Sequence, residues 1–177
     1  MIMNEQYAEV SYYYTEYATP IGKLTLACNE ASLVGLWIEG QKYFGATFLQ
    51  QAVRDNDYPV LKSAKEWLKR YFAGLKPELT ELSLAPQGSE FGQRVWKLLC
   101  EIPYGETTTY GELAKKVAAQ MGRESMSAQA VGGAVGRNPI SIIIPCHRVV
   151  GADGSLTGYA GGLDKKVSLL QLERQIN

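Results

Sequence analysis

The chain has 177 residues, of which 46% are hydrophobic and 20% charged, as is typical of a folded protein with one or two small domains. Eighteen lysines and arginines balance eighteen aspartates and glutamates, so the formal net charge is zero and does not indicate a nucleic-acid partner. Histidine is the most restrictive count, because the chain contains only His147. This excludes zinc sites built from several histidines, and any histidine chemistry must use His147.

The cysteine count also restricts the function. Cys28, Cys100 and Cys146 cannot all pair and show no C-x-x-C spacing, so we predict neither a disulfide framework nor a metal site. The N-terminus lacks the basic start and apolar core of a signal peptide, and no run of eighteen apolar residues occurs. We therefore expect a protein of the reducing cytoplasm.

The first half reads as a sheet followed by a helix. Three segments favour strands through their aromatic, apolar and β-branched residues: Tyr7–Tyr17, Lys23–Cys28 and Ser32–Ile38. Turn residues separate them, so we expect a short antiparallel meander. Pro59 suits the start of a helix that continues to Phe72 and ends at Gly74. Residues 79–88 look like a connection, which divides the chain into domains 1–85 and 86–177.

The second half predicts a helix-turn-helix arrangement. Apolar residues from Phe91 to Ile102 share one helical face. Thr109-Tyr110-Gly111-Glu112 fits a capping box that begins a helix at Tyr110, and Gly122 can end it. A short helix over Ala128–Gly136 then follows a cap at Ser125 or Ser127.

Beyond these helices, we expect a hairpin and a terminal helix. Val149–Val150 and Ser155–Leu156 would pair across the turn 151–154, and a helix from Leu163 to Arg174 would close the chain. Division at Pro86 leaves eight basic and ten acidic residues before it and ten basic and eight acidic after it. The slight positive charge of the second half would suit nucleic-acid binding.

The residues with the most chemistry lie in the segment 140–150, I-S-I-I-I-P-C-H-R-V-V. Cys146 stands beside His147 and Arg148, a positive setting that favours the reactive thiolate. A free cysteine is more often an inert buried thiol, which we expect of Cys28 and Cys100. For Cys146 we predict reactivity.

The adjacency of Cys146 and His147 restricts how they can cooperate. Neighbouring side chains diverge on a strand or helix, so a water relay is expected unless the backbone turns sharply. His147 also needs a partner that sets its tautomer. The spacing does not choose among four candidate carboxylates: Glu101, Asp153, Asp164 and Glu173.

The motif around Cys146 resembles that of a known family. Pro145 to Val150, preceded by Asn138-Pro139 and followed by Gly158 to Gly162, closely resembles the O6-alkylguanine-DNA alkyltransferases, also called methylated-DNA-protein-cysteine methyltransferases. The likeness continues through Phe91–Trp96, the Ile102–Gly105 turn and the terminal helix, about the last half of the chain. It implies an α/β (α+β) fold, with a ribonuclease-H-like sheet-and-helix domain followed by a winged helix-turn-helix-like domain.

The resemblance implies a single-turnover DNA repair protein that needs no cofactor. An alkyl group would pass from O6 of guanine, or less readily O4 of thymine, to Cys146. The thioether formed is not an acyl centre that water can attack, so the thiol is not regenerated. The partner would be double-stranded DNA, bound through its minor groove by a monomer. The alkylated base would leave the stack, which costs less for a damaged base.

The resemblance also assigns catalytic roles. The proton relay maps onto Glu173, His147, a bridging water and Cys146, while Asn138 would tie the helix-turn-helix to the active-site segment. Tyr110 would donate a proton or hydrogen bond as guanine leaves. Each of three residues also has a simpler interpretation. Glu173 could be an exposed glutamate at a helix end, Asn138 a turn residue before Pro139, and Tyr110 an aromatic residue at a helix start.

Further positions are implied for DNA and base contact. Main-chain groups of Cys146, Val149 and Ala160 would read the base edge, with Tyr159 as a wall of the pocket. The recognition helix would contribute Ala128, Gln129, Ala130, Gly132 and Val135. Many relatives carry an arginine at the position of Gln129 that fills the space left by the flipped nucleotide. Arg94 and Arg137 are candidates for phosphate contact.

The small residues of this helix need an explanation, because each glycine costs about 1 kcal/mol relative to alanine in a helix. Close approach to another backbone is one reason, and tight packing on a neighbouring helix is the other; the resemblance makes this the recognition helix that enters the minor groove.

Two other functions compete with alkyl transfer. Alkyltransferase-like proteins bind damaged DNA without reaction, but they replace the reactive cysteine that Cys146 supplies here. A cysteine hydrolase or acyltransferase could use Cys146 and His147, although their adjacency counts against direct cooperation.

Overall fold

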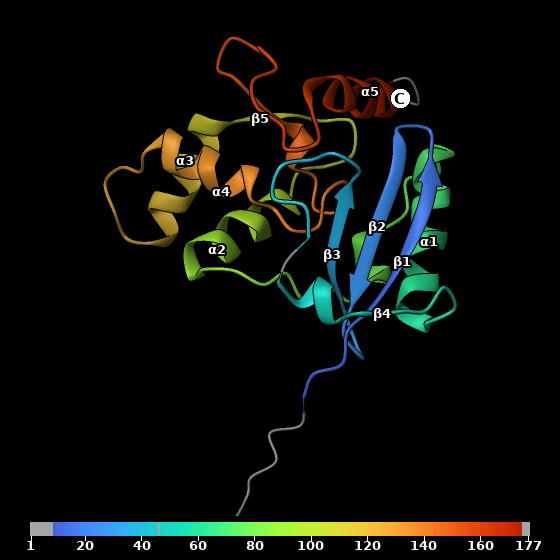
Figure 1. Cartoon of the computed structure of the whole chain (residues 1–177). Helices are drawn as coiled ribbons and strands as arrows, with labels where there is room; N and C mark the ends of the chain where they lie inside the picture. The colour runs from blue at the N-terminus through green and yellow to red at the C-terminus, as the bar shows by residue number, and fades with distance from the viewer. Residues whose placement is uncertain (1–8, 46, 175–177) are drawn as a thin grey trace, which may run out of the picture.

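The computed structural model describes residues 9–45 and 47–174 (Figure 1). A sheet with α1 beside it forms the N-terminal part, and α2, α3 and α4 group on the other side of the sheet, with α5 across one end. This is the predicted mixed α/β fold, with an N-terminal sheet domain and a helical C-terminal domain.

The sheet has four strands in the order β3-β2-β1-β4. Its strands are β1 (Tyr13–Thr19), β2 (Gly22–Cys28), β3 (Leu33–Ile38) and β4 (Val53–Arg54), with a short 3-10 helix, η1 (Thr47–Gln51), before β4. The meander of β1, β2 and β3 is antiparallel, as predicted. The predicted strand from Tyr7 is too long within the described residues, because β1 begins at Tyr13. Tyr7 itself lies outside the described residues. The parallel strand β4 was not predicted, since two residues carry no periodicity.

Helix α1 (Pro59–Phe72) supplies the apolar layer against the sheet. Its buried residues recur at helical spacing: Leu61, Ala64, Trp67, Leu68 and Tyr71. Gly74 follows with φ of 78°, a left-handed conformation that glycine adopts without strain, so the predicted end of the helix is confirmed.

The edge strand β3 joins the two parts of the chain. The connection after α1 contains a 3-10 turn, η2 (Leu79–Glu81), and then pairs with β3 through the Leu33 amide and the Ser83 carbonyl, 2.9 Å apart. On the same strand, the Leu36 amide donates to the Pro139 carbonyl at 2.9 Å. The segment that leads to Cys146 is therefore anchored to the N-terminal sheet.

The C-terminal helices follow the predicted caps. They are α2 (Glu90–Leu99), α3 (Tyr110–Gln120) and α4 (Ala128–Gly136), with β5 (Thr108–Thr109) before α3. The Thr109 hydroxyl accepts the Glu112 amide at 3.1 Å. The Ser127 hydroxyl accepts the Ala130 amide at 3.2 Å, so Ser127, rather than Ser125, caps α4. Over the described residues, no helix combines the length and apolarity needed to cross a membrane.

The predicted hairpin after Cys146 is wrong in its pairing. β6 (Val149–Val150) pairs in parallel with β5, and residues 155–156 form no strand. The turn itself exists, because the Gly151 amide donates to the Ser155 carbonyl at 2.8 Å. Beyond it, carbonyls of the loop bind Lys166 instead of continuing a ladder. The terminal helix α5 spans Leu163–Arg174, as predicted.

Candidate active site

The backbone before Cys146 folds into consecutive tight turns. The Ile143 amide donates to the Ser141 carbonyl at 2.8 Å, which puts Ile142 in a γ-turn with φ of 72°. This conformation is strained for a β-branched residue. A second such turn joins the Cys146 amide to the Ile144 carbonyl at 2.8 Å, and the 3-10 helix η3 (Cys146–Arg148) follows. The backbone thus turns sharply at the cysteine.

Asn138 stabilises these turns from the end of α4. Its Nδ2 donates to the Ile144 carbonyl at 2.7 Å, and its Oδ1 accepts the Ile140 amide at 3.0 Å. The side chain is buried, so these bonds satisfy groups that water does not reach. Asn138 therefore links α4 to the segment that carries Cys146.

Glu173 lies at the centre of a buried hydrogen-bonded group, which we call the relay cluster: Tyr71, His147, Arg148 and Glu173. Its Oε1 lies 2.7 Å from His147 Nε2 and accepts Tyr71 Oη at 2.7 Å and Arg148 Nη2 at 2.9 Å. Its Oε2 accepts Arg148 Nε at 2.9 Å. The other three candidate carboxylates are exposed.

The protonation states in the relay cluster follow from these bonds. Burial raises the pKa of Glu173, but hydrogen bonds and charge from His147 and Arg148 outweigh burial and hold the pKa at about 2. Burial lowers the pKa of His147 against the opposing effect of Glu173. An ionised carboxylate can only accept hydrogen bonds, so His147 Nε2 carries the proton and Nδ1 keeps its lone pair. Nδ1 is buried and has no hydrogen-bond partner among the described residues.

The positive charge near the Cys146 thiol comes from Lys166 and not from its sequence neighbours His147 and Arg148. The Arg148 guanidinium binds Glu173 and the Ile102 carbonyl. Burial raises the pKa of Cys146, partly opposed by the Asn138 side chain and the Lys166 charge. The prediction that His147 and Arg148 together favour the thiolate is therefore wrong, and the resting cysteine is a thiol that needs a base.

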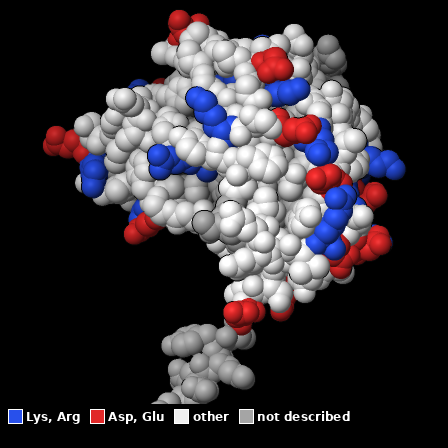
Figure 2. Space-filling view, viewed as in Figure 1, with Lys and Arg blue, Asp and Glu red and all other residues white. Residues whose placement is uncertain are grey.

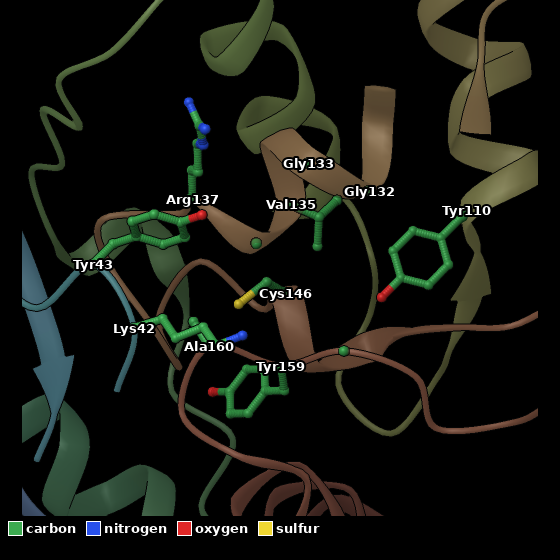
Figure 3. A pocket seen from close by; sticks show the side chains of 12 residues that line it. Lys42, Tyr43, Tyr110, Gly132, Gly133, Val135, Arg137, Cys146, Tyr159 and Ala160 are labelled. Carbon is green, nitrogen blue, oxygen red and sulfur yellow. The ribbon is translucent and has the colours of Figure 1, made fainter. Parts of the chain in front are cut away.

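A pocket of about 310 Å³ opens at Cys146. In Figure 3 its sulfur lies between Val135 on α4 and the Tyr159–Ala160 loop, with Tyr110 farther along the pocket. Seven of the predicted residues line it: Tyr110, Gly132, Val135, Arg137, Cys146, Tyr159 and Ala160. Five lining residues were not predicted as contacts: Lys42, Tyr43, Gly133, Gly136 and Gly158.

Comparison with protein families identifies the chain. Residues 12–86 match the ribonuclease-like domain of 6-O-methylguanine DNA methyltransferase, and residues 90–175 match the DNA binding domain of the same family. The chain belongs to this methyltransferase family.

Named relatives agree over most of the chain. A methylated-DNA-protein-cysteine methyltransferase of Methanosarcina barkeri is 45% identical over 175 residues, covering 91% of this chain and 96% of the relative. One from Mycolicibacterium paratuberculosis is 47% identical, with 90% and 93% covered. The crystal structure of Mycobacterium tuberculosis O6-methylguanine methyltransferase has a TM-score of 0.81 at 42% identity over 94% of each chain. OGT of that organism in complex with DNA gives 0.78 at 42% identity, again over 94% of each chain.

Four residues that were predicted to contact DNA or the base do not line the pocket. Ala128, Gln129 and Ala130 are exposed on the first turn of α4. Val149 is buried, and its carbonyl accepts Lys166 Nζ at 2.6 Å. These four residues are not among those that line the pocket.

Lys166 is a buried site residue that sequence reasoning missed. Its Nζ also donates to the Gly158 carbonyl at 3.2 Å, which holds the loop of the pocket against α5. Helical spacing could have revealed it, because Lys166, Leu169, Leu170 and Glu173 share one buried face.

The glycines of α4 are not explained by packing inside the methyltransferase. A Cβ at Gly132 would lie 3.6 Å from the Tyr110 ring, an ordinary contact. At Gly133 and Gly136 it would meet no described atom within 4 Å. Tight packing on a neighbouring helix is therefore wrong for these two positions, which face the pocket instead.

Charge does not single out a binding surface on the face shown in Figure 2. Basic and acidic side chains are interspersed there, especially over the sheet side. Shape and the bare glycines therefore mark the site more clearly than the charge difference between the two halves.

Proposed function

We propose that this methyltransferase transfers an alkyl group, such as methyl, from O6 of guanine in double-stranded DNA to Cys146, and less readily from O4 of thymine. One observation carries the proposal: the buried Cys146 thiol lies at the pocket, next to His147, whose Nδ1 lone pair has no partner among the described residues. The relatives named as methylated-DNA-protein-cysteine methyltransferases support the same reaction.

The relay cluster supplies the base. The thiol proton passes through a bridging water to His147 Nδ1, and Glu173 stabilises the imidazolium that forms. The sulfur attacks the alkyl carbon, so a C–S bond forms while the bond from that carbon to O6 breaks. The electron pair of the broken bond stays with guanine.

Tyr110 protonates or hydrogen-bonds the departing guanine. Its hydroxyl donates to the Thr157 carbonyl at 3.0 Å in the free protein, and burial raises its pKa, so it stays protonated at neutral pH. When the guanine binds, the Tyr110 hydroxyl leaves the Thr157 carbonyl and donates to the guanine instead. The product thioether has no acyl centre for water to attack, so each molecule reacts once and needs no cofactor.

DNA approaches through its minor groove, with α4 as the recognition helix. The bare surface at Gly133 and Gly136 admits the DNA backbone, and the alkylated base flips into the pocket. Gln129 enters the space that the base leaves, and Arg137 contacts a phosphate. Main-chain groups of Cys146, Val149 and Ala160 read the base edge, with Tyr159 as a wall.

Residues 86–177 form the domain that carries Cys146, and residues 1–85 form the domain that supports it and adds Lys42 and Tyr43 to the pocket. The protein acts as a monomer, and one chain is enough to supply the cysteine, the relay cluster and the pocket. All three cysteines are free, which fits a reducing cytoplasm.

The test measures the intact mass of the protein after incubation with a duplex that contains O6-methylguanine. We expect a gain of one methyl group, mapped to the Cys146 peptide. Cys146→Ser should show no gain, whereas Cys100→Ser should behave as wild type. Binding without a mass change would favour a damage-binding protein, and turnover of an ester with recovery of the thiol would favour a hydrolase. Either result would contradict the proposal.

A further inference from the structure

A residue of the N-terminal part enters the relay cluster. Tyr71 lies on the last turn of α1, 102 positions before Glu173, yet its hydroxyl donates to Glu173 Oε1 at 2.7 Å. His147 Nε2 contacts the same oxygen at 2.7 Å. One oxygen of the Glu173 carboxylate therefore links α1 to His147, the general base of the proposed reaction.

The Tyr71 ring is held rigidly. It is 1% exposed, stacks on Trp67 at 5.6 Å between ring centroids and meets the Tyr104 ring edge-on at 5.9 Å. Burial and the neighbouring Glu173 raise the pKa of Tyr71 well above 10, so its hydroxyl stays a donor. A fixed donor on a fixed ring defines where Oε1 lies.

We propose that Tyr71 is a positioning residue for alkyl transfer, which orients Glu173 and moderates its charge toward His147. Together with Arg148 it holds the carboxylate so that Oε1 accepts His147 Nε2–H, which keeps the Nδ1 lone pair free for the thiol proton. The N-terminal domain thus takes part in the reaction and does more than support the C-terminal one. This inference rests on the proposed alkyl transfer.

Tyr104 provides a matched control in the same cluster of rings. Its hydroxyl is also buried, but has no hydrogen-bond partner among the described residues. Tyr71→Phe and Tyr104→Phe each remove one buried hydroxyl and keep the ring. Only Tyr71→Phe removes a bond to Glu173.

The experiment measures single-turnover methyl transfer from an O6-methylguanine duplex at saturating protein across a pH series. We expect Tyr71→Phe to lower the rate constant at neutral pH about tenfold, the scale of one hydrogen bond to a charged group. With one donor fewer, the Glu173 charge stabilises protonated His147 more strongly, so the acid limb of the pH profile moves to higher pH. Tyr104→Phe should leave the acid limb in place.

A double-mutant cycle with Glu173→Gln tests whether Tyr71 acts through Glu173. In the Glu173→Gln background, Tyr71→Phe should change the rate constant less than about twofold, because the charge that it moderates is gone. At saturating protein, unfolded molecules only reduce the excess of active protein and leave the rate constant unchanged, so reduced stability does not imitate the effect.

The outcomes separate this inference from the proposed function. If wild-type protein transfers methyl and Tyr71→Phe matches Tyr104→Phe in rate and acid limb, the role of Tyr71 is wrong and the proposed function stands. An equal effect of Tyr71→Phe in both backgrounds would also overturn the role. Failure of wild-type protein to transfer methyl would overturn both.

Discussion

Cys146 lies between two surroundings of opposite kind. On one side, the relay cluster joins Glu173 to Tyr71, His147 and Arg148 through hydrogen bonds no longer than 2.9 Å. On the other side, α4 turns bare glycines toward an open pocket. The chain itself completes the first side, whereas the second leaves room for a partner. Changes to the relay cluster should therefore reduce stability and reaction together, while changes to the pocket should separate the two.

The largest effect is expected from Glu173→Ala. The substitution leaves Arg148 and His147 buried without their carboxylate, and breaking a buried ion pair in this way costs about 3–5 kcal/mol of unfolding free energy. Methyl transfer should fall to background, because His147 loses the group that sets its tautomer. Urea unfolding and the single-turnover rate measure the two effects. Glu101→Ala, at an exposed carboxylate, is the control. Equal stability of the two variants would contradict the role of the relay cluster.

Acid should weaken the relay cluster in two steps. The pKa of His147 is lowered on folding, so the unfolded chain takes up more protons as pH falls through the ordinary histidine range. The pKa of Glu173 falls from 4.5 to about 2, so its stabilisation is present above pH 4.5 and is lost between about pH 4.5 and 2. This second step amounts to about 3 kcal/mol.

Urea unfolding across a pH series measures both steps. Glu173→Gln cannot ionise, so it should lose the step below pH 4.5. If wild type and Glu173→Gln lost stability in parallel below that pH, the carboxylate would not be the titrating group.

On the pocket side, Gly133→Ala should separate stability from reaction. A Cβ there meets no described atom within 4 Å, and alanine favours a helix over glycine, so the unfolding free energy should rise by up to about 1 kcal/mol. The added methyl narrows the approach of DNA, and we expect methyl transfer to slow about tenfold, the cost of mild overpacking. Gly111→Ala on α3 is the helix-matched control that should keep the wild-type rate. An unchanged rate in Gly133→Ala would show that DNA does not approach this surface.

Features that depend on nearby residues could be predicted from the sequence, whereas features that depend on distant residues could not. Local signals were sufficient for the Thr109 cap and the bounds of α5, and they narrowed the cap of α4 to Ser125 or Ser127, because capping and helical periodicity depend on residues a few positions apart. The pairing of β6 with β5 was missed, because it joins residues about forty positions apart and two-residue strands have no pattern.

The site also combines features that local sequence could predict with features that depend on distant residues. The residues alone left four carboxylates open for His147, the family resemblance chose Glu173, and the structure puts that carboxylate 2.7 Å from the imidazole. Tyr71 and Lys42 reach the site from the N-terminal half, and no spacing rule connects residues so far apart. The adjacency of Arg148 to Cys146 led to a wrong prediction, because the buried Arg148 guanidinium pairs with the Glu173 carboxylate instead of acting on the thiol.

The smallest effect is expected from Gln129→Arg on the exposed first turn of α4. An added cation near a helix N-terminus is unfavourable by only a few tenths of a kcal/mol, so stability should barely change. If Gln129 lies against DNA, the arginine makes one new ionic contact, and the dependence of log affinity on log salt should steepen by about 0.9. Gln171→Arg, at an exposed position on another helix, α5, adds the same charge and is the matched control. Salt titrations of DNA binding compare the two slopes. Equal slopes would mean that any attraction comes from net charge alone, and that the first turn of α4 does not face the duplex.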